Sequence, residues 1–140
     1  MAVIIGIGTD IIDIERIEKT IERFGMRFLA RVFTDEERAR AAKSETPGAV
    51  YAKRWAAKEA CWKALGADSK RGIKWHDFTV TNSLHGAPIL TLTGAAAAQL
   101  ATQAGAGRTG RIHLSLSDER RMVVAFVVIS ADPVLTENPV

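Results

Sequence analysis

Residues 51–66 read Tyr-Ala-Lys-Arg-Trp-Ala-Ala-Lys-Glu-Ala-Cys-Trp-Lys-Ala-Leu-Gly, and this stretch decides the fold. It has no proline, no glycine before its last residue and many good helix formers, so it predicts a long helix. Gly66 suits the position just after a helix, where a left-handed backbone is common. At about 100° per residue, four large apolar residues share one helix face: Tyr51, Trp55, Trp62 and Leu65.

Two charged residues of this helix, Glu59 and Lys63, allow two interpretations. In the first they form an exposed i,i+4 ion pair that contributes about 0.2–0.5 kcal/mol. In the second, Glu59 is partly desolvated at the edge of the apolar face, and its carboxylate then needs a cation partner such as a metal ion. The helix alone leaves both open, because a metal site needs a second acid from elsewhere.

The composition indicates one globular domain. The chain has 140 residues, 47% of them hydrophobic, which is enough for one buried core. A single cysteine, Cys61, excludes an internal disulfide and suits a reducing compartment. Asp10 interrupts the apolar N-terminal run and no basic leader precedes it, so we expect no signal peptide, no membrane span and a cytoplasmic protein. The net charge of +3 favours an anionic partner.

The chain opens with a β-branched, apolar segment that predicts a central strand over residues 2–9. Gly6 and Gly8 leave room for something to approach the backbone of this strand closely. They are not the start of a dinucleotide fingerprint, because no third glycine follows at the required spacing. Asp10 comes at the predicted end of the strand, where a side chain can project into a site. A helix N-cap is its alternative role, which Asp13 fits better.

An amphipathic helix is predicted next, with Gly25 as its stop and an apolar stripe made of Ile14, Ile17, Ile21 and Phe24. Its charges are sorted, since the glutamates lie on one side of the stripe and Arg16 and Arg23 on the other. One interpretation is a solvated face with a Glu15–Lys19 pair. The other is a basic strip onto which an acidic helix of a partner protein docks.

The segments on either side of the central helix are short. A capping box formed by Thr34 and Glu37 predicts a helix that ends at about Lys43. Residues 44–48 are rich in polar residues, proline and glycine, and predict a break before the central helix. A polar loop is predicted after it, over residues 67–75, and its three basic side chains face either solvent or phosphate: Lys70, Arg71 and Lys74.

The second half of the chain is mostly strand. A hairpin is predicted from two short strands around a turn at residues 83–88, followed by an Ala-rich helix and two further strands. The predicted ranges are 78–82, 89–93, 94–104, 111–117 and 122–129. Residues 118–120 are expected to form a turn, and the last eight residues, 133–140, a loose tail.

The strand at 111–117 alternates strictly, so that His113 and two serines share one face and three apolar residues the other. This polar row is either solvated or a set of hydrogen-bond donors to phosphate. No repeat or long linker divides the chain. The order of elements predicts an α+β fold: a single domain over residues 1–132, with a mainly antiparallel sheet and a long central helix.

Three motifs now stand in order: Gly-Ile-Gly-Thr-Asp10, Trp-Ala-Ala-Lys-Glu59-Ala-x-x-Lys63 and His113-Leu-Ser-Leu-Ser-Asp-Glu. In this order and spacing, the chain resembles the holo-acyl-carrier-protein synthase family, the small 4′-phosphopantetheinyl transferases, from about residue 4 to 129. The resemblance implies a cytoplasmic transferase with the fold of that family. Such an enzyme moves 4′-phosphopantetheine from coenzyme A to a serine of apo-acyl carrier protein, releases adenosine 3′,5′-bisphosphate and supports fatty acid biosynthesis.

The resemblance also implies a set of site residues. The family depends on Mg²⁺, and its two metal-binding acids correspond to Asp10 and Glu59. Its phosphate-contacting lysine corresponds to Lys63, so these three residues would form the catalytic group. The family's small members are homotrimers with each site between two subunits. Coenzyme A and apo-acyl carrier protein are then the partners, and we expect no nucleic acid or membrane.

Further residues are assigned by the same resemblance. Gly86-Ala-Pro88 is similar to the family's Gly-x-Pro turn, and this turn, His113 and Arg54 would contact coenzyme A. Arg16 and Arg23 would grip the acidic carrier protein. The chain departs from many relatives at one position, since Asp118 stands where they carry a second histidine. No role of that histidine is transferred, and we expect Asp118 to shape the turn.

The chemistry of the residues agrees with these assignments. Mg²⁺ commonly takes one or two carboxylates and completes its shell with waters and substrate phosphates. Phosphoryl transfer is an in-line attack in which positioning and charge neutralisation supply most of the acceleration. Lys63 and His113 would offset charge on the leaving phosphate. Glu59 is in addition a hypothetical acceptor of the serine proton.

Two rival functions remain open from the residues alone. The first is a non-catalytic nucleic-acid-binding module, suggested by the basic helix, the basic loop and three tryptophans. Two of these tryptophans lie on the apolar face of the central helix, which indicates core residues rather than a stacking platform. The second rival is a Mg²⁺-dependent nucleotide phosphohydrolase that uses Asp10 and Glu59.

Overall fold

A computed structural model describes residues 1–66 and 72–135 of the chain. Two basic residues of the predicted polar loop lie outside the described residues, namely Lys70 and Arg71. Most of the predicted tail lies outside them as well. The elements in order are β1 (Val3–Asp13), α1 (Ile14–Phe24), α2 (Met26–Val32), α3 (Asp35–Ala42), α4 (Pro47–Ala64), the 3-10 turn η1 (Trp75–Asp77), β2 (Phe78–Asn82), β3 (Pro88–Leu92), α5 (Gly94–Ala104), β4 (Arg108–Glu119) and β5 (Met122–Pro133).

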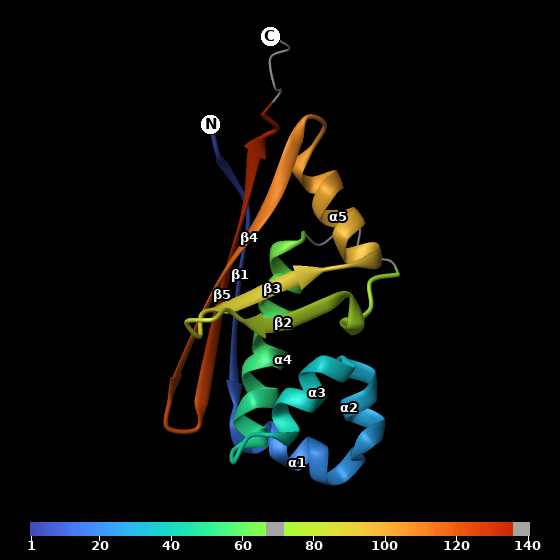
Figure 1. Cartoon of the computed structure of the whole chain (residues 1–140), viewed down its shortest axis with the longest axis vertical. Helices are drawn as coiled ribbons and strands as arrows, with labels where there is room; N and C mark the ends of the chain where they lie inside the picture. The colour runs from blue at the N-terminus through green and yellow to red at the C-terminus, as the bar shows by residue number, and fades with distance from the viewer. Residues whose placement is uncertain (67–71, 136–140) are drawn as a thin grey trace.

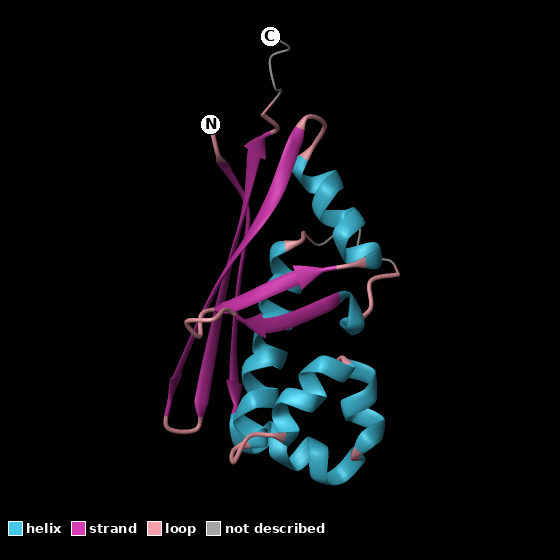
Figure 2. Ribbon diagram, in the orientation of Figure 1, coloured by secondary structure: helices cyan, strands magenta, loops and turns pink. Residues whose placement is uncertain are grey.

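Three long strands form the main layer, an antiparallel sheet in the order β1-β5-β4 (Figure 1). Helix α4 packs against β1 and β5, while β2 and β3 form a separate antiparallel hairpin. Figure 2 shows α1, α2 and α3 gathered at one end of the molecule and α5 toward the other. The predicted α+β fold with a mainly antiparallel sheet and a long central helix is confirmed.

Two glycines of β1 let α4 lie directly on the strand. A Cβ atom on Gly8 would stand 1.9 Å from the carbonyl oxygen of Ala60, and one on Gly6 would stand 2.2 Å from that of Ala64. Neither distance is possible for a real side chain, so only glycine fits at this crossing. The close approach that the sequence predicted for Gly6 and Gly8 is therefore present, and its partner is the backbone of α4.

Helix α4 begins at Pro47, earlier than predicted, because a proline fits the first turn of a helix, where its missing N–H leaves no hydrogen bond unmade. The predicted break at residues 44–48 is therefore wrong for Pro47 and Gly48, which belong to the helix. Gly66 follows the helix with a φ of +82°, as predicted.

Two tryptophans of α4 pack against Trp75. The ring centroid of Trp55 lies 4.7 Å from that of Trp75, and the ring centroid of Trp62 lies 5.5 Å from it. Trp55 and Trp62 are therefore core residues and not a stacking platform.

The three strands of the main sheet are longer than predicted, because pairing with a neighbour continues past the apolar segments, whereas β2 has the predicted bounds and β3 the predicted length. β1 pairs with β5 as far as Asp13, so Asp10 lies within the strand and not at its end. The prediction that Asp118 shapes a turn is also wrong. Asp118 lies in β4 opposite Val123, forms an ion pair with Lys53 at 3.5 Å, and the turn comes two residues later.

The two faces of the main sheet differ. Toward α4, the predicted apolar residues of β4 are half-buried: Ile112, Leu114 and Leu116. On the outer face, His113, Ser115 and Ser117 are exposed, as their alternation predicted. The outer face of the neighbouring strands is nevertheless apolar and exposed, and its residues are Ile4, Ile7, Ile11, Val124 and Phe126.

Candidate active site

Strand β1 and helix α4 bring Asp10 and Lys63 together. Asp10 lies opposite Ala125 of β5, on the face of the sheet that α4 covers. The Lys63 ammonium donates to the carbonyl oxygen of Thr9 at 2.9 Å and lies 3.4 Å from Asp10 Oδ1. Among the described residues, Lys63 therefore makes its ion pair with Asp10 and not with Glu59, so the simple surface pair within one helix is not the arrangement found.

Glu59 has a strongly shifted pKa. Burial is the largest cause and the neighbouring Asp10 carboxylate the next, and together they raise the pKa of Glu59 from 4.5 to about 7. The positive charges of Lys63 and Arg16 oppose this shift but do not cancel it. Near neutral pH the Glu59 carboxyl of the metal-free protein is therefore partly protonated, which indicates that the site has too little positive charge to keep both acids ionised.

The donor set fits a hard divalent cation. Asp10 Oδ2 is buried without a hydrogen-bond partner, an arrangement that is unfavourable unless a ligand occupies it. No group of three or more His, Cys, Asp or Glu side chains able to hold a metal occurs in residues 1–66 and 72–135. Two carboxylates are enough for Mg²⁺, which fills its other positions with waters and substrate phosphates.

A cavity of about 270 Å³ opens beside these acids. Asp10 and Glu59 line one part of it, and Trp55 and Phe28 supply apolar walls. Arg16 of α1 lines the same cavity, so the first helix contributes a positive charge to the region of the two carboxylates. A ligand in this cavity therefore meets an acid pair and a guanidinium at once.

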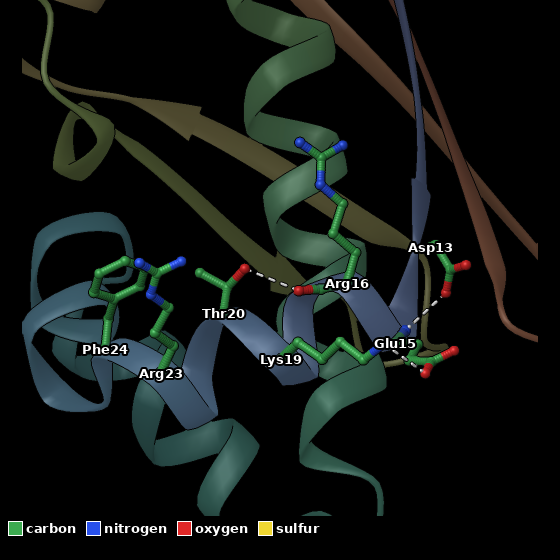
Figure 3. Close-up of a pocket in the computed structure, with 7 residues that line it drawn as sticks. All are labelled: Asp13, Glu15, Arg16, Lys19, Thr20, Arg23 and Phe24. Carbon is green, nitrogen blue, oxygen red and sulfur yellow. Dashed lines mark hydrogen bonds and ion pairs between the residues drawn. The ribbon is translucent and has the colours of Figure 1, made fainter.

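Helix α1 carries a second, more open pocket of about 380 Å³, shown in Figure 3. Arg16 and Arg23 both line it, and neither forms an ion pair with any described residue, whereas the predicted Glu15–Lys19 pair is present at 3.1 Å. Phe24, the last residue of the predicted apolar stripe, is exposed at the helix end, with the Arg23 guanidinium 5.1 Å from its ring centroid. The face thus offers free cations next to an apolar ring.

A chain of hydrogen bonds joins Arg54 to the β2–β3 turn. The Arg54 guanidinium donates to Asn82 Oδ1 at 3.2 Å, and Asn82 Nδ2 donates to the Gly86 carbonyl at 3.2 Å. Asn82 also pairs with Pro88 across the hairpin, so three of the residues assigned to coenzyme A surround one asparagine. Arg54 is 6% exposed, its Nε lacks a partner and burial lowers its pKa.

His113 is not brought to this site within one chain. It lies on β4 opposite Val128, on the outer face of the sheet, and its Nε2 is 2.9 Å from Ser130 Oγ. Asp10 faces the other way, toward α4. The sheet therefore separates His113 from the two carboxylates of the same chain.

Sequence reasoning missed several residues that organise this region. Asn82 carried no signal beyond its place at a hairpin end. Lys58 is buried and forms an ion pair with Glu37 at 2.6 Å. Residues 21 positions apart on different helices share no local periodicity, so no pattern in the sequence links these two.

Comparison with known proteins identifies the class to which this fold and site belong. The family model described as the 4′-phosphopantetheinyl transferase superfamily matches residues 6–124. The chain therefore belongs to this superfamily. Among the described residues, no helix has the length and apolar character needed to cross a membrane.

Within the superfamily, the similar proteins are holo-acyl-carrier-protein synthases. The enzyme from Rhodopseudomonas palustris is 54% identical over 141 residues, covering 98% of this chain and 97% of the relative. The crystal structure from Neisseria meningitidis is 35% identical, with a TM-score of 0.78 and coverage of 91% of this chain and 98% of that one. The structure from Helicobacter pylori, in complex with coenzyme A, is 30% identical, with a TM-score of 0.71 and coverage of 88% and 98%.

Proposed function

We propose that this chain transfers 4′-phosphopantetheine from coenzyme A to a serine of apo-acyl carrier protein. The observation that carries this proposal is the cluster of Asp10, Glu59 and Lys63 between β1 and α4, in a chain that belongs to the superfamily. The serine Oγ forms a bond to the phosphorus that bears pantetheine. The bond from that phosphorus to the bridging oxygen breaks, and its electron pair leaves with adenosine 3′,5′-bisphosphate.

Each of the three residues has a role in this step. Asp10 and Glu59 would hold Mg²⁺, which would supply positive charge to the pyrophosphate of coenzyme A. Lys63 is exposed enough to leave Asp10 and donate to a phosphate oxygen, which offsets the charge of the leaving group. Glu59 also accepts the serine proton, since it lines the cavity in which the serine would meet the phosphorus.

The coenzyme A side lies along Arg54 and the Gly86–Pro88 turn. Arg54 has an unpartnered Nε beside a cavity of about 190 Å³ that Arg40 also lines. Guanidinium groups bind phosphate strongly, so this cavity suits one of the phosphates of coenzyme A. The hydrogen bonds through Asn82 keep the turn next to this cation.

The carrier protein docks on α1. Arg16 and Arg23 are cations without an ion pair among the described residues, and the exposed ring of Phe24 lies beside them. An acidic helix with an apolar edge is complementary to such a strip. Arg16 also lines the cavity of Asp10 and Glu59, so a partner held by α1 presents its serine near the acids.

The active form is a homotrimer in which each site lies between two copies. The outer face of the main sheet, with Ile7, Ile11 and Phe126, leaves an apolar surface exposed on one chain, which a second copy would cover. His113 lies on this same face. When a second copy covers the face, His113 of the first chain can therefore contact the coenzyme A that the second copy binds. We also propose a cytoplasmic location and a place in fatty acid biosynthesis, both from the resemblance to the family.

Product analysis tests the proposed function. The chain is incubated with coenzyme A and Mg²⁺, with and without apo-acyl carrier protein, and adenosine 3′,5′-bisphosphate is measured by chromatography. Release that requires the carrier supports transfer. Release without the carrier would support a phosphohydrolase, and binding of oligonucleotides without any release would support a nucleic-acid-binding module.

A further inference from the structure

Lys58 and Glu37 form a completely buried ion pair that has no part in the proposed chemistry. Both side chains are 0% exposed, and the Lys58 ammonium lies 2.6 Å from Glu37 Oε1. Burying two charges is so unfavourable that apolar residues of similar volume often give equal or higher stability. Stability alone therefore does not account for this pair, and the elements that it joins point to another role.

The Lys58 ammonium uses all three of its hydrogens. Besides Glu37, it donates to the carbonyl oxygen of Val32 at 2.7 Å and to that of Trp75 at 3.2 Å. These acceptors belong to different elements, because Val32 ends α2, Trp75 begins η1 and Glu37 lies on α3. One side chain of α4 thus fixes three separate segments.

Glu37 extends the network to the hairpin. Its Oε1 also accepts from the backbone N–H of Thr34 at 2.9 Å, which closes the capping box of α3. Its Oε2 accepts from the backbone N–H of Val80 in β2 at 3.0 Å. Strand β2 ends at Asn82, the residue that holds Arg54 next to the β2–β3 turn.

The network also bears on the direction of Glu59. Lys58 precedes Glu59 on α4, and consecutive side chains of a helix point about 100° apart. Hydrogen bonds that hold Lys58 in one direction therefore hold the rotation of α4 that directs Glu59 toward Asp10. Helix α2, which follows the carrier-docking helix α1 directly, the coenzyme A hairpin (β2 and β3) and Glu59 are therefore linked through this one ammonium.

We propose that Lys58 and Glu37 are positioning residues that fix α2, and with it the adjoining carrier-docking helix α1, and the coenzyme A hairpin in position relative to Glu59. This inference rests on the proposed function. Each substrate contacts residues outside the network, so loss of the pair leaves both binding surfaces intact but changes their relative position. In-line transfer is sensitive to such a change, because a displacement of about 1 Å can lower a rate by about 10²-fold.

The test is the double variant Glu37→Leu/Lys58→Met, which removes both charges together at similar volume. Its kcat and its two KM values are compared with those of the wild type, whose own activity tests the proposed function separately. We expect thermal stability close to or above that of the wild type, kcat lowered by about tenfold or more and both KM values changed by less than about threefold. The matched control is Asp35→Asn/Arg38→Gln, which removes the surface ion pair of α3 and leaves kcat unchanged.

Two results would overturn the proposal. One is a folded double variant whose kcat stays within about twofold of the wild type. The other is a kcat that returns to the wild-type value once the assay temperature is lowered below the onset of unfolding, since the pair then acts only on stability. If the double variant does not fold, Glu37→Gln, which keeps the shape and one acceptor oxygen, is judged by the same kcat and KM criteria.

Discussion

Asp10 and His113 project from opposite faces of the same three-stranded sheet. Asp10 lies opposite Ala125 and faces α4, whereas His113 lies opposite Val128 on the uncovered face, with Ser130 Oγ at 2.9 Å from its Nε2. One chain therefore cannot bring both side chains to one substrate molecule. If both serve transfer, as we propose, the working site needs a second copy of the chain.

The assembly of the chain is the first prediction. Size-exclusion chromatography with light scattering should give a mass of about three chains for the wild type. Phe126→Glu places a charge in the middle of the exposed apolar face, so it should give a monomer with activity lowered by about tenfold or more. Met26→Glu changes another exposed apolar residue, on α2, and should remain trimeric. A wild type that is monomeric and fully active would contradict this prediction.

The docking face gives the second prediction. Arg16→Glu and Arg23→Glu should each raise the KM for the apo-carrier by about tenfold, equivalent to about 1.4 kcal/mol, because they place a like charge opposite an acidic helix. The KM for coenzyme A should stay unchanged for Arg23→Glu, which is remote from the acid pair. Lys43→Glu, with the same change of charge at the end of α3, serves as the control. Steady-state kinetics at two salt concentrations provide the measurement, and equal effects of all three substitutions would refute the docking assignment.

The crossing of β1 and α4 gives the third prediction. Gly8→Ala should lower the free energy of unfolding by about 3 kcal/mol or more, because the new Cβ would stand 1.9 Å from a backbone oxygen. Gly48→Ala should be much milder, since its Cβ meets only the flexible side chain of Glu18, at 2.6 Å. Urea denaturation of both variants measures the difference. Similar stabilities would mean that α4 does not rest on β1 as described.

The raised pKa of Glu59 gives the fourth prediction. Between pH of about 4.5 and about 7, the folded, metal-free protein binds more protons at Glu59 than the unfolded chain does. Its free energy of unfolding should therefore fall as the pH rises through this range. Glu59→Gln removes the titrating group and should flatten the dependence. Urea denaturation in the presence of a chelator provides the data, and parallel pH profiles for the two proteins would speak against the shift.

The sequence predicted the elements better than their ends. The spacing of the apolar residues and the N-cap Asp13 were sufficient to predict α1. The capping box of Thr34 and Glu37 was sufficient to predict α3. The ends of β1 and β5 were missed, because strand pairing continues past the apolar segment to Asp13 and Pro133. Such pairing depends on the neighbouring strand, and the local sequence carries no sign of it.

The candidate site was predictable to a smaller extent. The order of the motifs and the resemblance to the family predicted three site residues, Asp10, Glu59 and Lys63. The structure brings these residues together. Their roles stay predictions. Burial of Lys58 was not predictable, because lysine is among the residues least often buried and its partner is remote in the sequence. The domain boundary at residue 132 also stays a prediction.

The most direct measurement is the intact mass of an apo-acyl carrier protein after incubation with this chain, coenzyme A and Mg²⁺. We expect a gain equal to one phosphopantetheine, which is lost without Mg²⁺ and in both Asp10→Asn and Glu59→Gln. A gain that survives both substitutions would keep the transfer reaction but remove the proposed metal site. No gain on several apo-carriers, from a folded wild type that binds Mg²⁺, would contradict the central claim.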